Sequence, residues 1–384
     1  MVPKAVTSNA ALILRYRGLR ALPLSIAQMR ALREVDLTGN RLSHLPEPIG
    51  ELADLESLRV DENCLPFLPA SIERLTGLRE LHLDGNRIVA LPEGIGRLTR
   101  LETLHARGNR LNALPESLAR LSGLKDLRVG NNPLTAVPDS LWDLTNLEML
   151  DLSETGLECL SSRIRNLTRL RMLDLGHNEL TSVPQEIGSL PGLSDYLYLS
   201  NNRLTAVPES LGNLAKLAYL NLADNQLTAL PDTIGKMLNL KELRLYRNRL
   251  AALPDSLGNL SNLRELHLWN NQLSGLPDAL GGLRSLLQLR LQNNRLEALP
   301  DSIGTLTRLS ILDLRNNMLG SLPESMRGLH SLAYLDLRAN RLVDLPSSLG
   351  DLPNLEKLDL RWNKLSARPP WIERLEQRGC IVLR

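Results

Sequence analysis

The sequence predicts an α/β repeat solenoid, a fold in which short structural units stack in one direction. Residues 286–300 (LLQLRLQNNRLEALP) contain a frame made of Leu286, Leu289, Leu291, Asn294, Leu296, Leu299 and Pro300. The frame returns 23 residues later as Leu309, Leu312, Leu314, Asn317, Leu319, Leu322 and Pro323. A fixed period of this length indicates a solenoid, and it outweighs the expectation of two or more globular domains for a chain of 384 residues.

Each repeat is predicted to begin with a short strand. The alternation along this strand places Leu289 and Leu291 on one face. We expect the other face, formed by Gln288, Arg290 and Gln292, to point to solvent. One strand cannot bury its leucines alone, so the neighbouring repeats must complete the core.

A turn residue follows each strand, and it is nearly always asparagine. We expect its amide to bond backbone groups of adjacent turns that would otherwise be buried without partners, which makes the asparagines a ladder. The positions are Asn40, Asn63, Asn86, Asn109, Asn132, Thr155, Asn178, Asn202, Asn225, Asn248, Asn271, Asn294, Asn317, Asn340 and Asn363.

The segment after the turn follows the pattern L-P-[D/E]-S-[L/I]-G and returns the chain to the next strand. Proline fixes φ at the start of this segment. We expect Asp or Ser to cap a short helical turn and glycine to end it.

The repeats, about sixteen in number, fill residues 10–369. Residues 1–9 are predicted to be an N-terminal segment or minimal cap, which either folds over the first strand or marks a chain cut from a longer protein. Residues 370–384 are predicted to be a C-terminal cap, with an amphipathic helix between Pro370 and Gly379 and then a final strand.

The middle of the chain breaks the frame twice. One repeat carries Thr155 instead of the asparagine and Ser161 instead of the proline. The interval from Asn178 to Asn202 is 24 residues, with an extra residue near Ser194–Asp195 that predicts a bulge and re-aimed tyrosines after it. These departures indicate either drift at a junction between duplicated blocks or a local bend that shapes a binding surface.

The frame LxxLxLxxNxLxxLPxxIGxLxx resembles that of the leucine-rich-repeat proteins of the 23-residue intracellular Ras-group type, which include Ras-pathway scaffolds, plant intracellular relatives and bacterial proteins. The resemblance implies a horseshoe with a concave parallel β-sheet and short helical or irregular convex segments. It also implies a protein partner on the concave face, such as a small GTPase or another signalling protein. Because the frame is scaffold, the variable positions must carry any recognition.

Aromatic side chains and methionines gather at the strand positions that lie two, four and six residues before the turn residue. These residue types are enriched at protein–protein hot spots, although Tyr and Trp also favour strands for their own sake. Both interpretations remain open, a binding site or strand decoration. The candidate partner-binding residues are Met149, Met172, Tyr196, Tyr198, Tyr219, Tyr246 and Trp269, with Arg244, His267 and Arg290 as polar contacts.

Two further patterns favour structural roles. The column of Asp313, Asp336 and Asp359 stands beside the column of Arg315, Arg338 and Arg361. We expect these columns to neutralise each other in solvent, with a polar rim contacted by a partner as the alternative. His82 and His105 stand on neighbouring strands, but a metal site needs three or four converging ligands, so no metal site is expected.

Composition and motifs exclude several functional classes. The formal net charge of +2 gives no case for nucleic-acid or membrane binding, and neither a signal peptide nor an apolar span is visible. Cys64, Cys159 and Cys380 form no metal or disulfide pattern, which indicates reduced thiols in the cytoplasm. No catalytic motif or cofactor fingerprint is present.

The sequence therefore predicts a monomeric, cytoplasmic, non-enzymatic protein-binding scaffold without a cofactor, located in the host cytosol if it is a secreted bacterial effector. The alternative is the recognition region of a larger protein, either an effector enzyme such as a ubiquitin ligase or GTPase, or an immune-type receptor. A designed scaffold without a partner is disfavoured, because the repeats are irregular.

Overall fold

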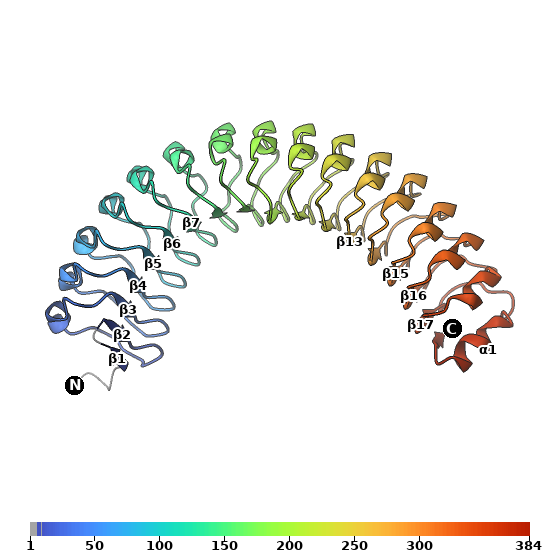
Figure 1. Ribbon diagram of the computed structural model, residues 1–384, viewed down its shortest axis with the longest axis horizontal. Helices are drawn as coiled ribbons and strands as arrows, with labels where there is room; N and C mark the ends of the chain where they lie inside the picture. The colour runs from blue at the N-terminus through green and yellow to red at the C-terminus, as the bar shows by residue number, and fades with distance from the viewer. Residues whose placement is uncertain (1–5, 9) are drawn as a thin grey trace. The chain divides into compact units, whose positions relative to one another are not determined.

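A computed structural model describes residues 6–8 and 10–384, and it divides into two compact units. The first unit comprises the chain up to Leu180 together with Leu190–Leu193, and the second comprises Thr181–Ser189 and Ser194–Arg384. Within each unit, the strands line one side and the return turns line the opposite side (Figure 1). The predicted solenoid of stacked strands and turns is confirmed.

The first unit contains an antiparallel pair followed by a parallel array. Strand β1 pairs antiparallel with β2, with Val6 opposite Ile13, so residues 6–8 of the predicted N-terminal segment lie along the first repeat strand. Residues 1–5 and 9 of that segment lie outside the described part of the chain. The strands are β1 (Val6–Ser8), β2 (Ala11–Ile13), β3 (Glu34–Asp36), β4 (Ser57–Arg59), β5 (Glu80–His82), β6 (Thr103–His105), β7 (Asp126–Arg128), β8 (Met149–Asp151) and β9 (Met172–Asp174).

The second unit is a parallel array that ends in a helix and a strand. Helix α1 (Trp371–Gln377) precedes β18, and β18 pairs parallel with β17. Arg378, just after the helix, donates to the carbonyl groups of Gly350 (2.8 Å) and Leu352 (3.2 Å), which ties the segment to the preceding repeat. The strands are β10 (Tyr196–Tyr198), β11 (Tyr219–Asn221), β12 (Glu242–Arg244), β13 (Glu265–His267), β14 (Gln288–Arg290), β15 (Ile311–Asp313), β16 (Tyr334–Asp336), β17 (Lys357–Asp359) and β18 (Ile381–Leu383).

The return segments are five-residue 3-10 turns. In the first unit they are η1 (Leu24–Gln28), η2 (Glu47–Glu51), η3 (Ala70–Arg74), η4 (Glu93–Arg97), η5 (Glu116–Arg120), η6 (Asp139–Asp143) and η7 (Ser162–Asn166). In the second they are η8 (Gln185–Ser189), η9 (Glu209–Asn213), η10 (Asp232–Lys236), η11 (Asp255–Asn259), η12 (Asp278–Gly282), η13 (Asp301–Thr305), η14 (Glu324–Gly328) and η15 (Ser347–Asp351).

The expected roles of the turn residues need correction. Pro300 precedes η13 with φ −70° and ψ 151°, and its carbonyl accepts the amide of Ile303 at 3.0 Å, without any side-chain cap. Gly304 lies inside this turn and does not end it. A β-carbon there would lie 2.0 Å from the carbonyl oxygen of Ser325, so glycine is required by close packing of adjacent turns. Among the turns whose cap is described, the expectation that Asp or Ser caps the turn is met at η7, where Ser161 replaces the proline and accepts the amide of Arg163 at 3.2 Å.

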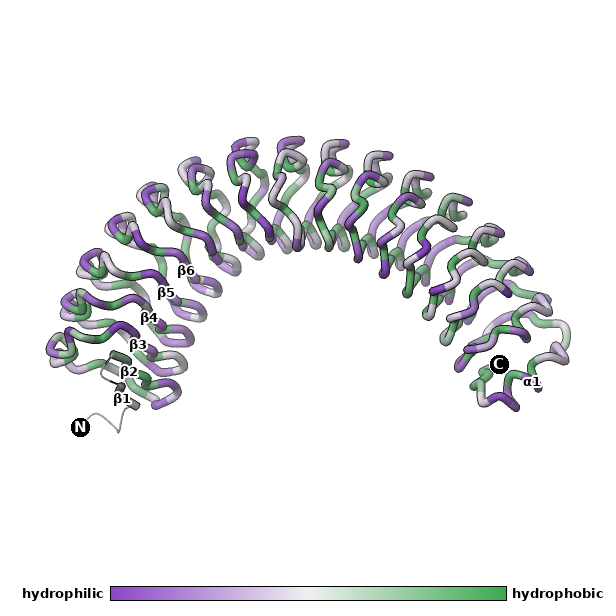
Figure 2. The backbone as a smooth tube through the Cα atoms, viewed as in Figure 1, coloured by the Kyte–Doolittle hydropathy of each residue, from purple (hydrophilic) through white to green (hydrophobic). Residues whose placement is uncertain are grey.

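The core consists of the frame leucines, which alternate with hydrophilic positions along each repeat (Figure 2). Leu289 and Leu291 are both fully buried, as predicted. Gln292 contradicts the prediction, because it is only 6% exposed, although it stands on the side expected to face solvent.

The predicted asparagine ladder is confirmed. The Nδ2 of Asn294 donates to the carbonyl groups of Leu268 (3.0 Å) and Leu291 (2.9 Å), and its Oδ1 accepts the amide of Leu273 (3.1 Å). One side chain thus satisfies backbone groups of two repeats, which would be costly to bury without partners.

The ladder is interrupted at Thr155. Its hydroxyl donates to the carbonyl of Leu152 at 2.9 Å. Threonine lacks the side-chain amide with which an asparagine would bond the preceding repeat. The amide of Leu134 bonds the carbonyl of Asn132 (2.8 Å) in place of an asparagine side chain. A shallow pocket lies beside this gap, lined by Asn109, Asn131, Asn132, Pro133, Thr135, Glu154, Thr155 and Gly156.

The extra residue of the long interval lies just before β10. In regular repeats two successive amides share one carbonyl, as Lys241 and Glu242 share that of Ala218. Here the amide of Ala218 bonds Ser194 and the amide of Tyr219 bonds Asp195. The bulge is therefore confirmed, and the regular register resumes at the following strand.

No helix among the described residues is long and apolar enough to cross a membrane.

Candidate functional site

The structure places the ten candidate residues in two sets. Met149 and Met172 belong to the first unit, where they stand in register on β8 and β9 and are partly buried. The second unit holds the other eight, on or directly after β10 to β14: Tyr196, Tyr198, Tyr219, Arg244, Tyr246, His267, Trp269 and Arg290.

Three tyrosines contact one another on β10 and β11. The ring centroids of Tyr196 and Tyr198 are 4.8 Å apart, and those of Tyr198 and Tyr219 are 5.1 Å apart. The guanidinium of Arg244 lies over the Tyr219 ring, 5.3 Å from its centroid. Burial raises the pKa of the Tyr219 phenol above its ordinary value, so this group stays a neutral hydrogen-bond donor.

Two further rings stack directly after β12 and β13. Tyr246 and Trp269 are parallel within 6°, with centroids 4.3 Å apart. Arg247, which the sequence did not single out, lies over Trp269 at 5.1 Å and pairs with Asp224 at 3.2 Å. We call Tyr196, Tyr198, Tyr219, Tyr246 and Trp269 the aromatic cluster.

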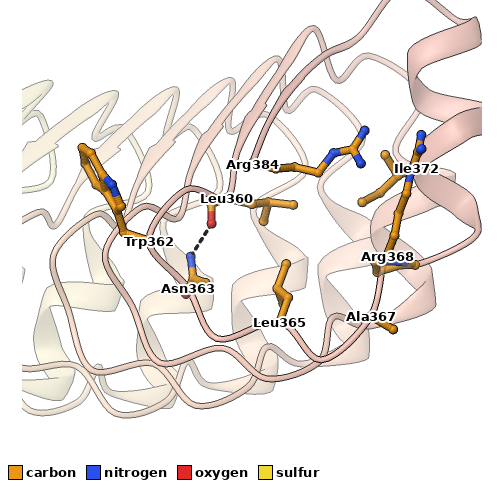
Figure 3. A pocket seen from close by; sticks show the side chains of 9 residues that line it. Leu360, Trp362, Asn363, Leu365, Ala367, Arg368, Ile372 and Arg384 are labelled. Atoms are coloured by element: carbon orange, nitrogen blue, oxygen red, sulfur yellow. Dashed lines mark hydrogen bonds between the residues drawn. The ribbon is translucent and has the colours of Figure 1, made fainter.

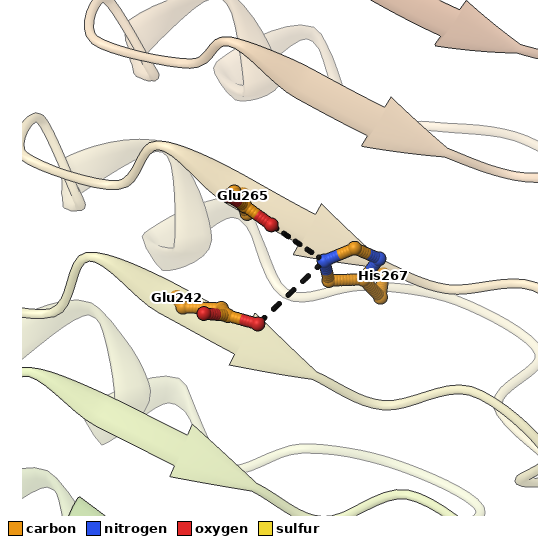
Figure 4. Close-up of side chains that lie close together, drawn as sticks. All are labelled: Glu242, Glu265 and His267. Atoms are coloured by element: carbon orange, nitrogen blue, oxygen red, sulfur yellow. Dashed lines mark hydrogen bonds and ion pairs between the residues drawn. The ribbon is translucent and has the colours of Figure 1, made fainter.

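Charged side chains occupy the strand positions beside the cluster (Figure 4). The Nε of Arg244 donates to Oε1 of Glu242 at 2.6 Å. The Nε2 of His267 lies 3.1 Å from Oε2 of Glu265 and 3.8 Å from Oε1 of Glu242. Sequence reasoning missed both glutamates, although they occupy the column six residues before the turn asparagine, in which contacts were expected.

His267 and Arg290 are less exposed than surface contacts would be. His267 is 9% exposed, and this burial lowers its pKa despite the neighbouring carboxylates, which act in the opposite direction. Arg290 donates to Oε1 of Gln288 at 3.3 Å, while its Nε is buried without a partner among the described residues. The described contacts of both residues are thus with strand residues of their own face and not with the aromatic rings.

The Asp and Arg columns neutralise each other, as expected, but the aspartates are buried and not solvated, which corrects that part of the expectation. Asp336 and Asp359 are 0% and 1% exposed. Arg338 pairs with Asp336 on its own strand and reaches Asp359 on the next at 3.3 Å. Burial opposes ionisation of Asp336, but hydrogen bonds from Arg338 outweigh it and hold the pKa of this carboxyl below its ordinary value. Asp313 lacks bonds of this strength, and burial raises its pKa.

The two histidines of the first unit touch each other edge to face, with centroids 4.6 Å apart. His105 pairs with Asp126 at 3.0 Å, and Arg128 shares the same carboxylate. His82 lies 3.7 Å from Glu80, and its Nε2 has no hydrogen-bond partner among the described residues.

A pocket of about 240 Å³ lies at the end of the second unit (Figure 3). Arg368 and Arg384 border it, but both donate to Glu376, at 2.8 and 2.6 Å. The single charge of Glu376 offsets one of these two positive charges, and Glu373 lies 3.9 Å from Arg368. The lining residues are Leu360, Trp362, Asn363, Leu365, Ala367, Arg368, Pro369, Ile372 and Arg384.

Comparison with family models matches most of the repeat array. The model described as "Leucine-rich repeat region" matches residues 70–175 and 155–272. The model described as "Leucine rich repeat" matches residues 30–88, 288–342 and 307–365, and a third leucine-rich repeat model matches residues 262–283. No curated protein sequence matches the chain.

Solved structures with similar folds include proteins of bacteria and plants. A leucine-rich repeat protein of Leptospira interrogans is 32% identical over 97% of this chain and 94% of that one, with a TM-score of 0.78. The plant peptide hormone receptor RGFR1, solved in complex with RGF2, is 30% identical over 95% of this chain, with a TM-score of 0.81; the chain spans 61% of that receptor's length. The Arabidopsis receptor kinase HAESA, in complex with the peptide hormone IDA and the co-receptor SERK1, is 27% identical over 98% of this chain and 74% of that one, with a TM-score of 0.66.

Proposed function

Because this chain belongs to the leucine-rich repeat family, we propose that it is a non-enzymatic scaffold that binds a protein or peptide partner on the exposed side of its strands. The aromatic cluster is the centre of the proposed site. Met149 and Met172 of the first unit are proposed as further apolar contacts.

The aromatic cluster is the observation that supports this site. Its five rings stand on or directly after the consecutive strands β10 to β13. Tyr246 and Trp269 are stacked, Tyr198 contacts both Tyr196 and Tyr219, and arginines lie over Tyr219 and Trp269. Rigid aromatic side chains expose a large contact area and lose little conformational entropy on binding, which is why Tyr, Trp and Arg dominate interface energetics. The strands already hold these rings in place, so a partner would not have to order them.

The solved neighbours agree with a peptide or protein ligand. Two of the plant receptors were solved in complex with peptide hormones. A peptide laid along the strands would contact one repeat after another, so its affinity would be distributed over several strands.

The finer assignments are also proposals. The 23-residue frame supports the intracellular Ras-group type, with a small GTPase or another signalling protein as partner, a monomeric state and a cytoplasmic location. The second candidate, a recognition region of a larger receptor or effector, is supported by the similarity to the ectodomains of plant receptor kinases.

A quantitative pull-down tests the proposed site. A variant with Tyr196, Tyr219, Tyr246 and Trp269 replaced by Ala is compared with wild type, after circular dichroism has shown equal folding. The matched control replaces Phe67, Leu238 and Trp362 by Ala, because these apolar residues are 57%, 51% and 71% exposed and lie outside the aromatic cluster.

We expect wild type and the control to capture a partner in equal amounts, and the cluster variant to capture at least tenfold less of it. Purification of that partner and titration against the three proteins then measures the affinity. Equal capture by the cluster variant would remove the cluster as the binding site and direct attention to the convex turns.

A further inference from the structure

Three potential metal ligands converge on β12 and β13 of the second unit (Figure 4). The parallel register of β12 and β13 places Glu242 opposite Glu265, and Arg244 opposite His267. One ligand atom from each of Glu242, Glu265 and His267 lies within 4.8 Å of the other two. No other such group of three occurs among the described residues.

The spacing matches the needs of a first-row transition metal. Zinc binds imidazole nitrogen and carboxylate oxygen at about 2.0–2.2 Å, which places the ligand atoms of a tetrahedral site about 3.4 Å apart. The two separations from Nε2 of His267, 3.1 and 3.8 Å, bracket that value. Backbones fixed by the sheet hold all three side chains, so only small side-chain rotations are required.

The structure thus points to a divalent-metal site: we infer that Glu242, Glu265 and His267 bind Zn²⁺ or a similar first-row ion, with at least one coordination position left for water. An imidazole with two carboxylates suits zinc and its neighbours better than calcium or magnesium, which prefer oxygen alone. The site does not depend on the proposed partner.

The three ligand side chains differ in their exposure to solvent. His267 is 9% exposed. The two glutamates remain partly exposed, with side-chain exposures of 21% and 34%, so an ion can reach them from the strand face.

Arg244 is the competitor for this ion. Its Nε donates at 2.6 Å to the same Oε1 of Glu242 that faces His267. Metal binding therefore replaces a hydrogen bond to Arg244 by a coordination bond, and the guanidinium keeps its position over the ring of Tyr219. Removing the arginine charge should strengthen metal binding.

The first unit supplies a matched control. His105 also pairs with a carboxylate that an arginine shares, but among the described carboxylates Asp126 alone pairs with its Nε2. One imidazole and one carboxylate do not make a metal site.

Isothermal titration of the purified, tag-free protein with Zn²⁺ alone at neutral pH tests the inference, with circular dichroism to verify folding. Wild type is compared with Glu265→Gln, His267→Gln, Arg244→Gln and the control Asp126→Asn. Co²⁺ titration, followed by its visible absorption, reports the coordination geometry of the same ion site.

We expect one Zn²⁺ per chain, at least tenfold weaker binding in Glu265→Gln and His267→Gln, unchanged binding in Asp126→Asn, and tighter binding in Arg244→Gln. Absence of Zn²⁺ binding by wild type would overturn the inference, as would equal binding by Glu265→Gln. Weaker binding by folded Arg244→Gln would overturn the assignment of Glu242 as a ligand. Because no partner is present, none of these outcomes depends on the scaffold function.

Discussion

Gly304 shows how closely neighbouring repeats pack at the scale of one residue. A β-carbon there would meet the carbonyl oxygen of Ser325 at 2.0 Å, whereas one at Gly320 would meet nothing within 4 Å. We therefore expect Gly304→Ala to lower the free energy of unfolding by about 1–3 kcal/mol through overpacking. Gly320→Ala is the control and should change it by less than about 0.5 kcal/mol. Equal effects in urea titrations of the two variants would contradict this packing role.

His82 makes stability depend on pH. Burial is the main reason that its pKa is lowered, with His105 and Arg59 acting in the same direction. As pH falls, His82 takes up a proton first in the unfolded state, near pH 6.5. The free energy of unfolding therefore decreases between pH 6.5 and the lowered pKa that His82 has in the folded state. Thermal unfolding at neutral and mildly acidic pH should show a smaller acid loss in His82→Gln than in wild type. An identical loss in both would exclude His82 as the source.

Residue-level burial was only partly predictable from the sequence. The leucine frame follows from a strict period, and Leu289 and Leu291 are buried as expected. Gln292 and His267 stand on the other side of their strands, yet they are only 6% and 9% exposed, so neighbouring side chains must cover them. That coverage depends on the lengths and conformations of those neighbouring side chains, which the period does not encode.

At the scale of the element, the gap at Thr155 interrupts the asparagine ladder. Restoring the amide by Thr155→Asn should provide a donor for the preceding repeat and an acceptor for the amide of Leu134, which now bonds Asn132. We expect a gain of about 1 kcal/mol in the free energy of unfolding, the usual net value of one hydrogen bond. A loss in chemical denaturation would show that the local turn has adapted to threonine.

The strands and the ladder were predictable because both follow from fixed spacing. The bulge at Ser194–Asp195 was predictable from the single 24-residue interval, and the hydrogen bonds of Ala218 and Tyr219 show how it is absorbed. The caps of the return turns were not predictable in the same way. The pattern of polar residues after proline suits a side-chain cap, but the proline carbonyl takes that role in η13.

For the whole molecule, the repeat architecture limits how far a defect spreads. Each repeat contacts only its neighbours, so stability is close to a sum of local contributions. Leu289→Ala, which opens a cavity at a fully buried position in β14, should cost about 2–5 kcal/mol. Hydrogen exchange should rise most in β13 to β15, and the control Leu81→Ala should raise it most in β4 to β6. A uniform rise throughout the chain in both variants would contradict local unfolding.

The fold class could be predicted from the sequence because one short motif, repeated, dictates it. The candidate site could be predicted as columns of aromatic residues, and the structure brings Tyr196, Tyr198 and Tyr219 into contact. The approach of Glu242 and Glu265 to His267 could not be predicted from the sequence, because it depends on the side-chain conformations of all three residues.

The stack of Tyr246 on Trp269 has an optical consequence. The chain has four tryptophans, and Trp142 and Trp371 are buried at 1% and 6% exposure, while Trp362 is 71% exposed and lies outside the aromatic cluster. Trp269 alone stands where a ligand on the cluster would touch an indole and displace Arg247 from its face. A protein with Trp362 replaced by Phe would therefore carry one tryptophan that is not buried, and a change in tryptophan emission would report occupancy of this surface without any attached dye.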